Sequence, residues 1–205
     1  MGQRDWVYTL IRIIALPIMK IFFRFEVHNK NCLPSEGRYI ICSNHISIVD
    51  PILLMVTQKR KICFMAKNEL FQNKLFGKLL YAVGVFPVNR DKTDLRAISE
   101  AEEILKNEKV MGIFLEGTRS RNGEFLKPKA GAAMIAYNTN TKILPVCITC
   151  GDMGRVRLFK KVIISYGDVI SPNELGILQG KGTEFRNASR EIMSKLSELR
   201  NSSAR

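Results

Sequence analysis

The sequence predicts an α/β fold, a single layered domain in which helices flank a largely parallel central sheet. After residue 38, short apolar runs rich in β-favouring residues alternate with segments whose apolar residues have helical spacing. Strands that alternate with helices are typical of a parallel sheet, because each parallel connection needs a crossover. The apolar runs are residues 39–43, 62–66, 85–88, 110–115, 143–148 and 161–166.

Two of the intervening segments show a clear helical period. Their apolar residues recur every three or four positions, which places them on one face of a helix. Thr93 or Asp94 is a candidate cap for the first helix and Thr183 for the second, because side-chain oxygens accept hydrogen bonds from first-turn N–H groups. The apolar faces consist of Leu95, Ile98, Ala101 and Leu105, and of Phe185, Ile192, Leu196 and Leu199.

Length and composition indicate one domain. The chain has 205 residues, of which 46% are hydrophobic and 25% charged, enough for one well-formed core, and no stretch resembles a linker. We expect the α/β domain to occupy residues 31–205 and to follow an N-terminal segment over residues 1–30.

The five cysteines lie mostly inside apolar runs, as reduced and buried cysteines do. Cys147 and Cys150 have the spacing of half a metal site, but no second Cys/His pair accompanies them. Three residues apart in a strand, they would face opposite sides of the sheet. We therefore expect core packing and no metal site.

The N-terminal stretch "DWVYTLIRIIALPIMKIFFRF" is apolar and aromatic, but Arg12, Pro17 and Lys20 interrupt it. Cations near the middle of a membrane-spanning helix would be costly. No small-residue cleavage site follows the stretch, so it does not fit an ordinary signal peptide. We expect an amphipathic helix that docks on the surface of an anionic membrane. The alternative is a helix that only covers the core.

The chain is strongly basic, with a formal net charge of +13. This charge favours phosphate-bearing or other anionic partners, but charge alone does not separate nucleic acid from an anionic membrane or an acidic protein. The basic loops lack the interleaved aromatic residues that stack on single-stranded bases. We therefore expect no nucleic acid partner.

Three polar loops follow apolar runs: "SNHISIVDP" after the first, "NRDKTD" after the third and "EGTRSRNGEF" after the fourth. In α/β folds with parallel sheets, ligands bind where strands pass into loops at their carboxyl ends. The three loops therefore predict one shared site.

His45 and Asp50 are the candidates for acid–base chemistry. Residues five apart lie about 140° apart around a helix, so these two meet only if His45 lies in the loop and Asp50 in the first turn. A carboxylate that holds one imidazole nitrogen leaves the other to accept a proton, which would make His45 a general base. The proton would come from a hydroxyl, either of a substrate or of Ser43 or Ser47. A serine nucleophile is not favoured, because the sequence has no G-x-S-x-G elbow. For Asp50, the alternative role is that of a helix cap.

The stretch "FLEGTRSR" is a candidate phosphate site. Gly117 allows the backbone to approach a ligand closely, and arginines such as Arg119 donate paired hydrogen bonds to phosphate oxygens. Lys127 precedes a helix start, which also favours an anion, and Arg90 at the end of "GVFPVNR" is a further candidate. The alternative is a solvated basic loop. The stretch lacks G-x-x-x-x-G-K-[ST], so it is not a nucleotide P-loop.

Four blocks together resemble the lysophosphatidic acid acyltransferase family, within the glycerolipid acyltransferases. The blocks follow the order and approximate spacing of the family. One difference is visible: the third block of the family commonly reads F-P-E-G-T-R, and this chain has Leu115 in place of the proline. The blocks are N-H-x-x-x-x-D at Asn44, His45 and Asp50, "GVFPVNR" ending at Arg90, "FLEGTRSR" at 114–121, and "ILPVCI" with Pro145.

The resemblance implies an acyl transfer with His45 and Asp50 as catalytic residues. His45 would deprotonate the sn-2 hydroxyl of a lysophosphatidate, Asp50 would orient His45, and the hydroxyl would attack the thioester of acyl carrier protein or coenzyme A. The thioester is a co-substrate, and no cofactor is expected. The N-terminal helix resembles the docking helices of bacterial members, which implies a peripheral or monotopic enzyme on the cytoplasmic face of the cell membrane. The expected substrate-binding residues are Arg90, Glu116, Gly117, Thr118, Arg119 and Lys127.

Two other functions stay open on the sequence alone. The same motifs would serve an acyltransferase whose acceptor is glycerol 3-phosphate or another lyso-lipid. A non-catalytic basic protein that binds membrane or nucleic acid would explain the charge and the arginine loops, but it gives His45 and Asp50 no task.

Overall fold

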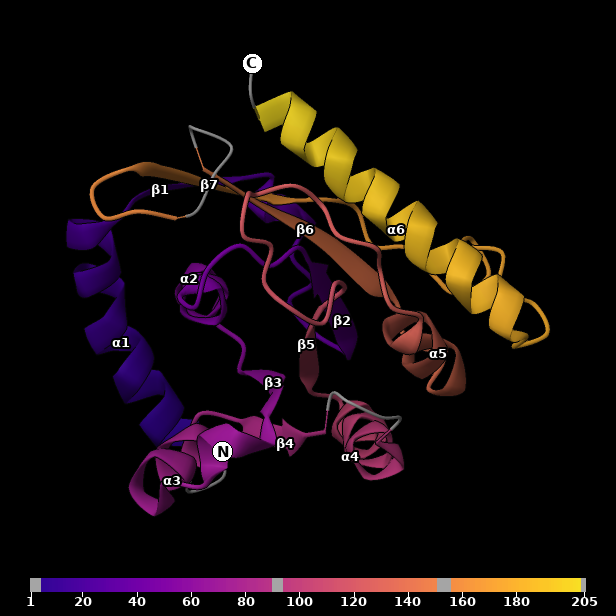
Figure 1. Cartoon of the computed structure of the whole chain (residues 1–205), viewed down its shortest axis with the longest axis horizontal. Coiled ribbons are helices and arrows are strands. Elements are labelled where there is room, and N and C mark those ends of the chain that lie inside the picture. Colours follow the sequence, from indigo (N-terminus) through magenta and orange to yellow (C-terminus); the bar gives the residue numbers. More distant parts are fainter. Residues whose placement is uncertain (1–4, 90–93, 151–155, 204–205) are drawn as a thin grey trace.

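A seven-stranded sheet forms the centre of the computed structural model, which describes residues 5–89, 94–150 and 156–203 (Figure 1). The strand order is β1-β7-β6-β2-β5-β3-β4. β6 and β7 pair antiparallel, whereas the other neighbouring strands pair parallel, so the predicted largely parallel sheet is confirmed. The strands are β1 (Arg24–His28), β2 (Tyr39–Ser43), β3 (Ile62–Lys67), β4 (Val85–Val88), β5 (Val110–Phe114), β6 (Ile143–Cys150) and β7 (Lys161–Tyr166).

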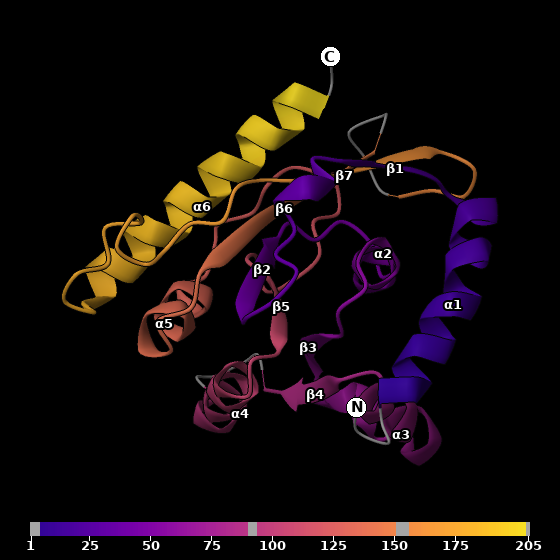
Figure 2. The same ribbon diagram turned by 180° about the vertical axis from the view of Figure 1, so that it is seen from behind.

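Helices cover both faces of this sheet. α4, α5 and α6 pack against one face and α1 and α2 against the other, an arrangement that Figures 1 and 2 show from opposite sides. Two 3-10 turns, η1 (Lys30–Cys32) and η2 (Asn68–Phe71), complete the described elements. The helices are α1 (Asp5–Phe22), α2 (Asp50–Thr57), α3 (Lys74–Ala82), α4 (Leu95–Lys106), α5 (Gly131–Asn138) and α6 (Gly182–Ser203).

The central strand β2 shows why the predicted runs are so apolar. Ile40 and Cys42 belong to the core beneath α4–α6, whereas Tyr39 and Ile41 belong to the core beneath α1 and α2. A strand buried on both faces has no polar alternation, and this is typical of parallel sheets covered by helices. The core packing expected for the cysteines of β6 is also confirmed, because Cys147 and Cys150 are buried in opposite cores.

Strand β1 was not predicted, because its sequence does not read as a buried run. Residues Arg24–His28 alternate between exposed and partly buried positions along the edge of the sheet, where β1 pairs with β7. Thus the N-terminal segment expected over residues 1–30 supplies both α1 and an edge strand of the sheet. Edge strands carry weaker hydrophobic patterns because only one side is paired and covered.

One of the proposed helix caps is confirmed and one is wrong. Asp94 accepts a hydrogen bond from the N–H of Ala97 at the start of α4, while Thr93 lies outside the described residues. Thr183 does not cap α6, because the helix already begins at Gly182. The carboxylate of Glu184 instead accepts hydrogen bonds from the preceding backbone at Gln179 and Lys181.

The helix α1 packs into the fold with one side only. Tyr8, Met19 and Phe23 are buried against the core beneath α2, whereas the outward side of α1 is almost entirely apolar and exposed. Over the described ranges, none of the helices combines the length and the hydropathy needed to cross a bilayer. α1 is therefore apolar on both sides, and its exposed apolar side is a surface that needs a partner.

Candidate active site

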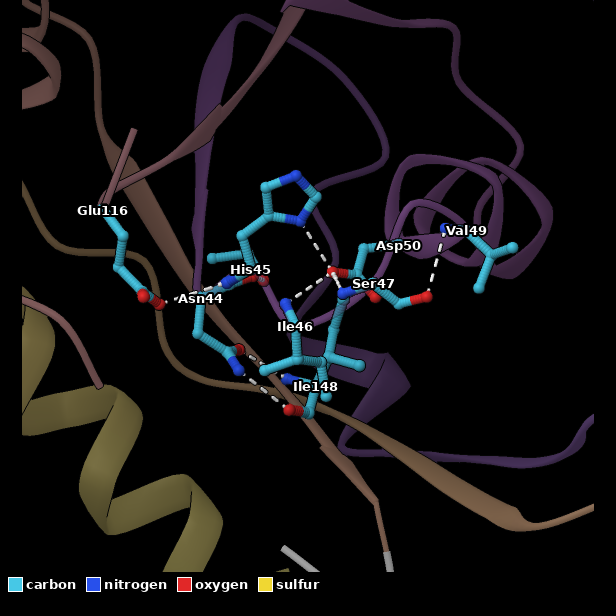
Figure 3. Close-up of polar contacts among 9 residues, drawn as sticks. Asn44, His45, Ile46, Ser47, Val49, Asp50, Glu116 and Ile148 are labelled. Atoms are coloured by element: carbon cyan, nitrogen blue, oxygen red, sulfur yellow. Dashed lines mark hydrogen bonds and ion pairs between the residues drawn. The ribbon is translucent and has the colours of Figure 1, made fainter. Parts of the chain in front are cut away.

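His45 and Asp50 meet at the corner between β2 and α2 (Figure 3). The His45 Nδ1 atom lies 2.7 Å from the Asp50 Oδ2 atom. The imidazole lies in the loop and the carboxylate in the first turn of α2, which is the arrangement that the five-residue spacing requires. Both are buried, with 8% of His45 and none of Asp50 exposed. Asp50 therefore fixes which side of the imidazole faces the protein and leaves Nε2 for a substrate.

The same oxygen of Asp50 also organises the start of α2. Oδ2 accepts hydrogen bonds from the N–H groups of Ile46 at 2.8 Å and Ser47 at 2.7 Å. The contact of Asp50 with the imidazole is therefore present, whereas the alternative of a helix cap is wrong, because α2 begins at Asp50 itself and has no side-chain cap hydrogen bond at Val49. A carboxylate near a helix N-terminus is also favoured by the helix dipole. The position of α2 and the orientation of His45 are thus coupled.

Asn44 locks this corner to the neighbouring strand. Its side chain donates to the Ile148 carbonyl at 2.9 Å and accepts from the Ile148 N–H at 2.8 Å. Backbone pairing between β2 and β6 stops at Ser43, opposite Val146, so the amide of Asn44 continues the ladder with a side chain. The sequence contained Asn44 in the first block, but only the structure shows this task.

Aromatic rings stack behind His45. The imidazole lies on the ring of Phe114, with centroids 4.0 Å apart and planes 15° apart, and Phe64 continues the stack at 5.7 Å from Phe114. Gly112 makes room for Phe64, because a Cβ there would lie 2.2 Å from the Phe64 ring. Sequence reasoning missed these residues. The available signal was that Phe114 directly begins the "FLEGTRSR" block.

Glu116 ties the His45 loop to the loop after β5. One carboxylate oxygen accepts from the N–H of His45 at 3.1 Å, and the other accepts from the N–H of Leu126 at 3.2 Å. In return the Ser120 N–H donates to the His45 carbonyl at 2.8 Å. Burial raises the pKa of Glu116, and these hydrogen bonds together with the nearby Arg200 oppose that rise only in part. The two loops therefore form one unit around the His45 backbone.

The remaining predicted substrate residues lie on this same loop. Gly117 adopts a left-handed turn with φ of 66°, and Thr118 and Arg119, which follow it, are exposed. Lys127 is also exposed and lies next to Leu126, the residue held by Glu116. Arg90 falls outside the described residues, so its place relative to His45 is not described. The structure thus brings the loop of Gly117, Thr118 and Arg119 to the corner of His45 and Asp50.

A residue of α6 that the sequence did not single out supports this loop. Arg200 donates to the Gly123 carbonyl at 3.0 Å, and its guanidinium carbon lies 3.5 Å from the centroid of the Phe125 ring. A cation over an aromatic face is attracted by the ring quadrupole. No local sequence pattern connects Arg200 with a loop 77 positions earlier, so only the fold could reveal the contact.

The serines of the corner have structural contacts. The Ser43 hydroxyl, which is 1% exposed, donates to the carbonyl of Asn44, and the Ser47 hydroxyl accepts from the Val49 N–H. Among the described residues, no three His, Cys, Asp or Glu side chains gather as a group that could hold a metal ion. The corner itself therefore offers one buried base with a carboxylate partner, beside a basic loop.

Comparisons with known proteins assign this arrangement to a family. A family model described as Acyltransferase matches residues 24–149. The chain is 30% identical over 183 residues to a 1-acyl-sn-glycerol-3-phosphate acyltransferase of Streptococcus pneumoniae, covering 86% of this chain and 67% of that protein. It is 36% identical over 137 residues to the enzyme of the same name in Bacillus subtilis, covering 66% and 67%.

A solved structure is similar over nearly the whole chain. The crystal structure of the 1-acyl-sn-glycerophosphate (LPA) acyltransferase PlsC from Thermotoga maritima superposes with a TM-score of 0.76 at 26% identity, covering 96% of this chain and 80% of that one. The family match over residues 24–149 and the curated relatives define an acyltransferase, and the chain belongs to this family of enzymes. The two curated relatives are named 1-acyl-sn-glycerol-3-phosphate acyltransferases, and the solved neighbour is named a 1-acyl-sn-glycerophosphate (LPA) acyltransferase.

Proposed function

We propose that this enzyme moves an acyl group from a thioester to the sn-2 hydroxyl of 1-acyl-glycerol 3-phosphate and so makes phosphatidate. The observation that carries the proposal is the contact between His45 and Asp50 at the end of β2, with the loop of Gly117 and Arg119 bonded to the same corner. The names of the relatives support the same acceptor.

The corner supports direct transfer. Asp50 accepts from the Nδ1–H of His45, and Nε2 removes the proton from the acceptor hydroxyl. The hydroxyl oxygen attacks the thioester carbonyl, and the C–O bond forms. When the tetrahedral intermediate collapses, the C–S bond breaks, and the imidazolium of His45 returns its proton to the departing thiolate. The contacts of Ser43 and Ser47 favour this route over an acyl-serine, because both hydroxyls take part in local backbone hydrogen bonds.

We assign the acceptor phosphate to the loop after β5. Arg119 and Lys127 supply exposed positive charge, and the turn at Gly117 together with the Thr118 hydroxyl can approach an anion closely. Arg90 remains a proposed ligand by resemblance. For Glu116 the geometry favours a different task from the expected acceptor contact, because both of its oxygens bind backbone N–H groups. We propose that Glu116 holds the acceptor loop against His45.

We also propose that the enzyme works on the surface of an anionic membrane. α1 contacts α3, and beyond the other end of α1 the ring of Phe159 lies 6.0 Å from that of Phe22. Together they present one apolar surface, the docking face. Its residues are Trp6, Leu10, Ile13, Ile14, Ile18, Ile21 and Phe22 of α1, Leu75, Phe76 and Leu79 of α3, and Leu158 and Phe159.

Charge supports the membrane as the occupant of the docking face. Lys20, Arg24 and Lys160 are exposed at the end of α1 that meets Phe159, where they would contact lipid headgroups. Arg12, the cation that made a spanning helix costly, turns away from the docking face toward α2. The overall charge of +13 adds attraction to anionic lipid. Since the acceptor is itself a lipid, docking on the cytoplasmic leaflet would bring it to the enzyme.

The co-substrate is proposed to be acyl carrier protein or coenzyme A as the thioester, with no further cofactor. The test is product formation by purified protein on anionic vesicles that contain lysophosphatidate, with either thioester as donor. We expect thiol release matched by an equal amount of phosphatidate acylated at sn-2. Thiol release with glycerol 3-phosphate or another lyso-lipid, but not with lysophosphatidate, would keep the enzyme class and replace the acceptor. No thiol release with any of them would overturn the proposal.

A further inference from the structure

Arg12 of α1 binds the end of α2 that lies opposite Asp50. Its Nε atom donates to the carbonyls of Met55 at 3.1 Å and Gln58 at 2.5 Å, and its Nη2 atom donates to that of Val56 at 3.3 Å. These carbonyls lie in and just after the last turn of α2, where a helix leaves its acceptors without partners. A cation there is also favoured by the helix dipole. Arg12 is therefore a side-chain cap supplied by a different helix.

The other end of the same helix carries the catalytic carboxylate. α2 has eight residues, so at 1.5 Å per residue it is about 12 Å long, a rigid body of two turns. Oδ2 of Asp50 holds three donors, from His45, Ile46 and Ser47, all within 2.7 to 2.8 Å. Such short charge-assisted bonds tolerate little displacement. A shift or rotation of α2 would therefore move the carboxylate away from the imidazole.

We propose that Arg12 is a positioning residue for the reaction: by fixing the last turn of α2, it sets the place of Asp50 and hence the orientation of His45. The inference rests on the proposed function, because it assigns a kinetic consequence to a base that the proposed function requires. It also gives α1 two tasks on two sides. The outward side forms the docking face, and the inward side holds the helix that carries Asp50.

This linkage has a geometric meaning for a surface enzyme. The bonds of Arg12 hold α2 to α1, and α1 carries most of the docking face that we propose contacts the lipid. On a docked enzyme, the guanidinium group of Arg12 and the apolar packing of Tyr8 and Met19 would therefore help to set the height of the His45–Asp50 pair above the membrane. Because Arg12 points inward, its loss should not weaken docking itself.

The test compares Arg12→Ala with Arg60→Ala. Arg60 is a matched control, because its guanidinium also donates to two backbone carbonyls, those of Gly37 and Glu108, but these precede β2 and β5, at the ends of the strands away from His45. We expect Arg12→Ala to lower kcat roughly 10- to 100-fold, because small misplacements of catalytic groups have effects of that size. The KM for lysophosphatidate and binding to anionic vesicles should stay within about twofold. Arg60→Ala should leave kcat unchanged.

A second comparison asks whether the effect passes through Asp50. In the Asp50→Asn background, Arg12→Ala should lower kcat by less than about threefold, since the contact that Arg12 positions is already impaired. Arg12→Lys keeps a cation at the end of α2 and should recover part of the loss. Circular dichroism at the assay temperature checks that each variant is folded. Where Arg12→Ala is unstable, Arg12→Gln, which keeps hydrogen-bond donors, replaces it in the comparison.

Several outcomes would overturn the inference. In the first, Arg12→Ala has the kcat of the wild type. In the second, Arg60→Ala loses as much kcat as Arg12→Ala. In the third, Arg12→Ala lowers kcat by the same factor in the Asp50→Asn background as in the wild-type background. Failure of the proposed function is distinguishable, because it would appear as absence of phosphatidate formation by the wild-type enzyme, before any variant is compared.

Discussion

The imidazole of His45 stacks on the ring of Phe114, with centroids 4.0 Å apart and planes only 15° apart. Asp50 fixes His45 through a hydrogen bond in the plane of the ring, and Phe114 restricts it from the face. The two contacts are perpendicular and together determine where Nε2 points. An imidazole held in this way needs little reorganisation to accept a proton from a hydroxyl, and preorganisation of this kind contributes directly to rate.

Replacing Phe114 by leucine should reduce catalysis more than stability. Aromatic pairs are worth about 0.5–1.5 kcal/mol beyond the area that they bury, so Phe114→Leu should lower kcat about 3- to 10-fold as the ring of His45 loses its orientation. Steady-state kinetics at saturating acceptor measure the change. Phe185→Leu removes another ring pair, with Tyr137 beneath α6, and should lower stability but not kcat. Equal kinetic effects of the two substitutions would refute a specific role for Phe114.

Glu116 predicts a pH dependence of stability. Because burial raises the pKa of Glu116 above 4.5, the protonated form is favoured in the folded state. The contribution of the protonated Glu116 carboxyl to the free energy of unfolding is therefore complete below the ordinary glutamate pKa. It is lost as the pH rises through the raised pKa of the folded state. The free energy of unfolding of the wild type minus that of Glu116→Gln, measured by urea denaturation, should fall as the pH rises from below 4.5 through the raised pKa. A rise over this range would contradict the cited shift.

Arg119 should govern the affinity for the acceptor. A hydrogen bond to a charged group is worth about 1.5–3 kcal/mol, so Arg119→Ala should raise the KM for lysophosphatidate roughly 10- to 100-fold. Arg186→Ala, on the exposed side of α6, removes the same charge at a distance and serves as the control. If the two variants change KM equally, the effect is one of overall charge, and Arg119 does not bind the phosphate.

The docking face predicts vesicle binding that one substitution can abolish. Ile14 is 53% exposed on α1, and transferring such a side chain into lipid contributes about 1.5–3 kcal/mol, so Ile14→Glu should weaken binding to anionic vesicles at least about tenfold. Leu178→Glu, 70% exposed before α6, is the matched control and should bind normally. Deleting α1 would be a poorer test, because Tyr8 and Met19 belong to the core. Unchanged sedimentation of Ile14→Glu with vesicles would reject this surface.

The sequence was most informative where burial is two-sided. All the apolar runs expected after residue 38 are strands, because a central parallel strand such as β2 is apolar on both faces. The edge strand β1 was missed because its polar residues, among them Glu26 and His28, face solvent or each other. Thr183 was proposed as a cap from its residue type. However, α6 already begins at Gly182, and Glu184 binds the backbone that precedes the helix.

The site was predictable only in part for a related reason. His45 and Asp50 are close in sequence, so spacing and a strand-to-helix corner were enough to predict their contact. Phe114 contacts His45 across 69 positions, Arg200 contacts Gly123 across 77, and Arg12 contacts Met55 across 43. No local sequence pattern predicts contacts over such separations. They depend on which strands are neighbours, and the order β6-β2-β5 follows from packing of the whole sheet.

The central claim is that His45 is the base of acyl transfer to lysophosphatidate. The most direct measurement is phosphatidate formation by the wild type and by His45→Ala, on the same vesicles and with the same thioester. The account predicts a 10²- to 10⁴-fold lower kcat in the variant, roughly the usual contribution of a general base, with the fold intact by circular dichroism. Near-wild-type turnover by folded His45→Ala would contradict it.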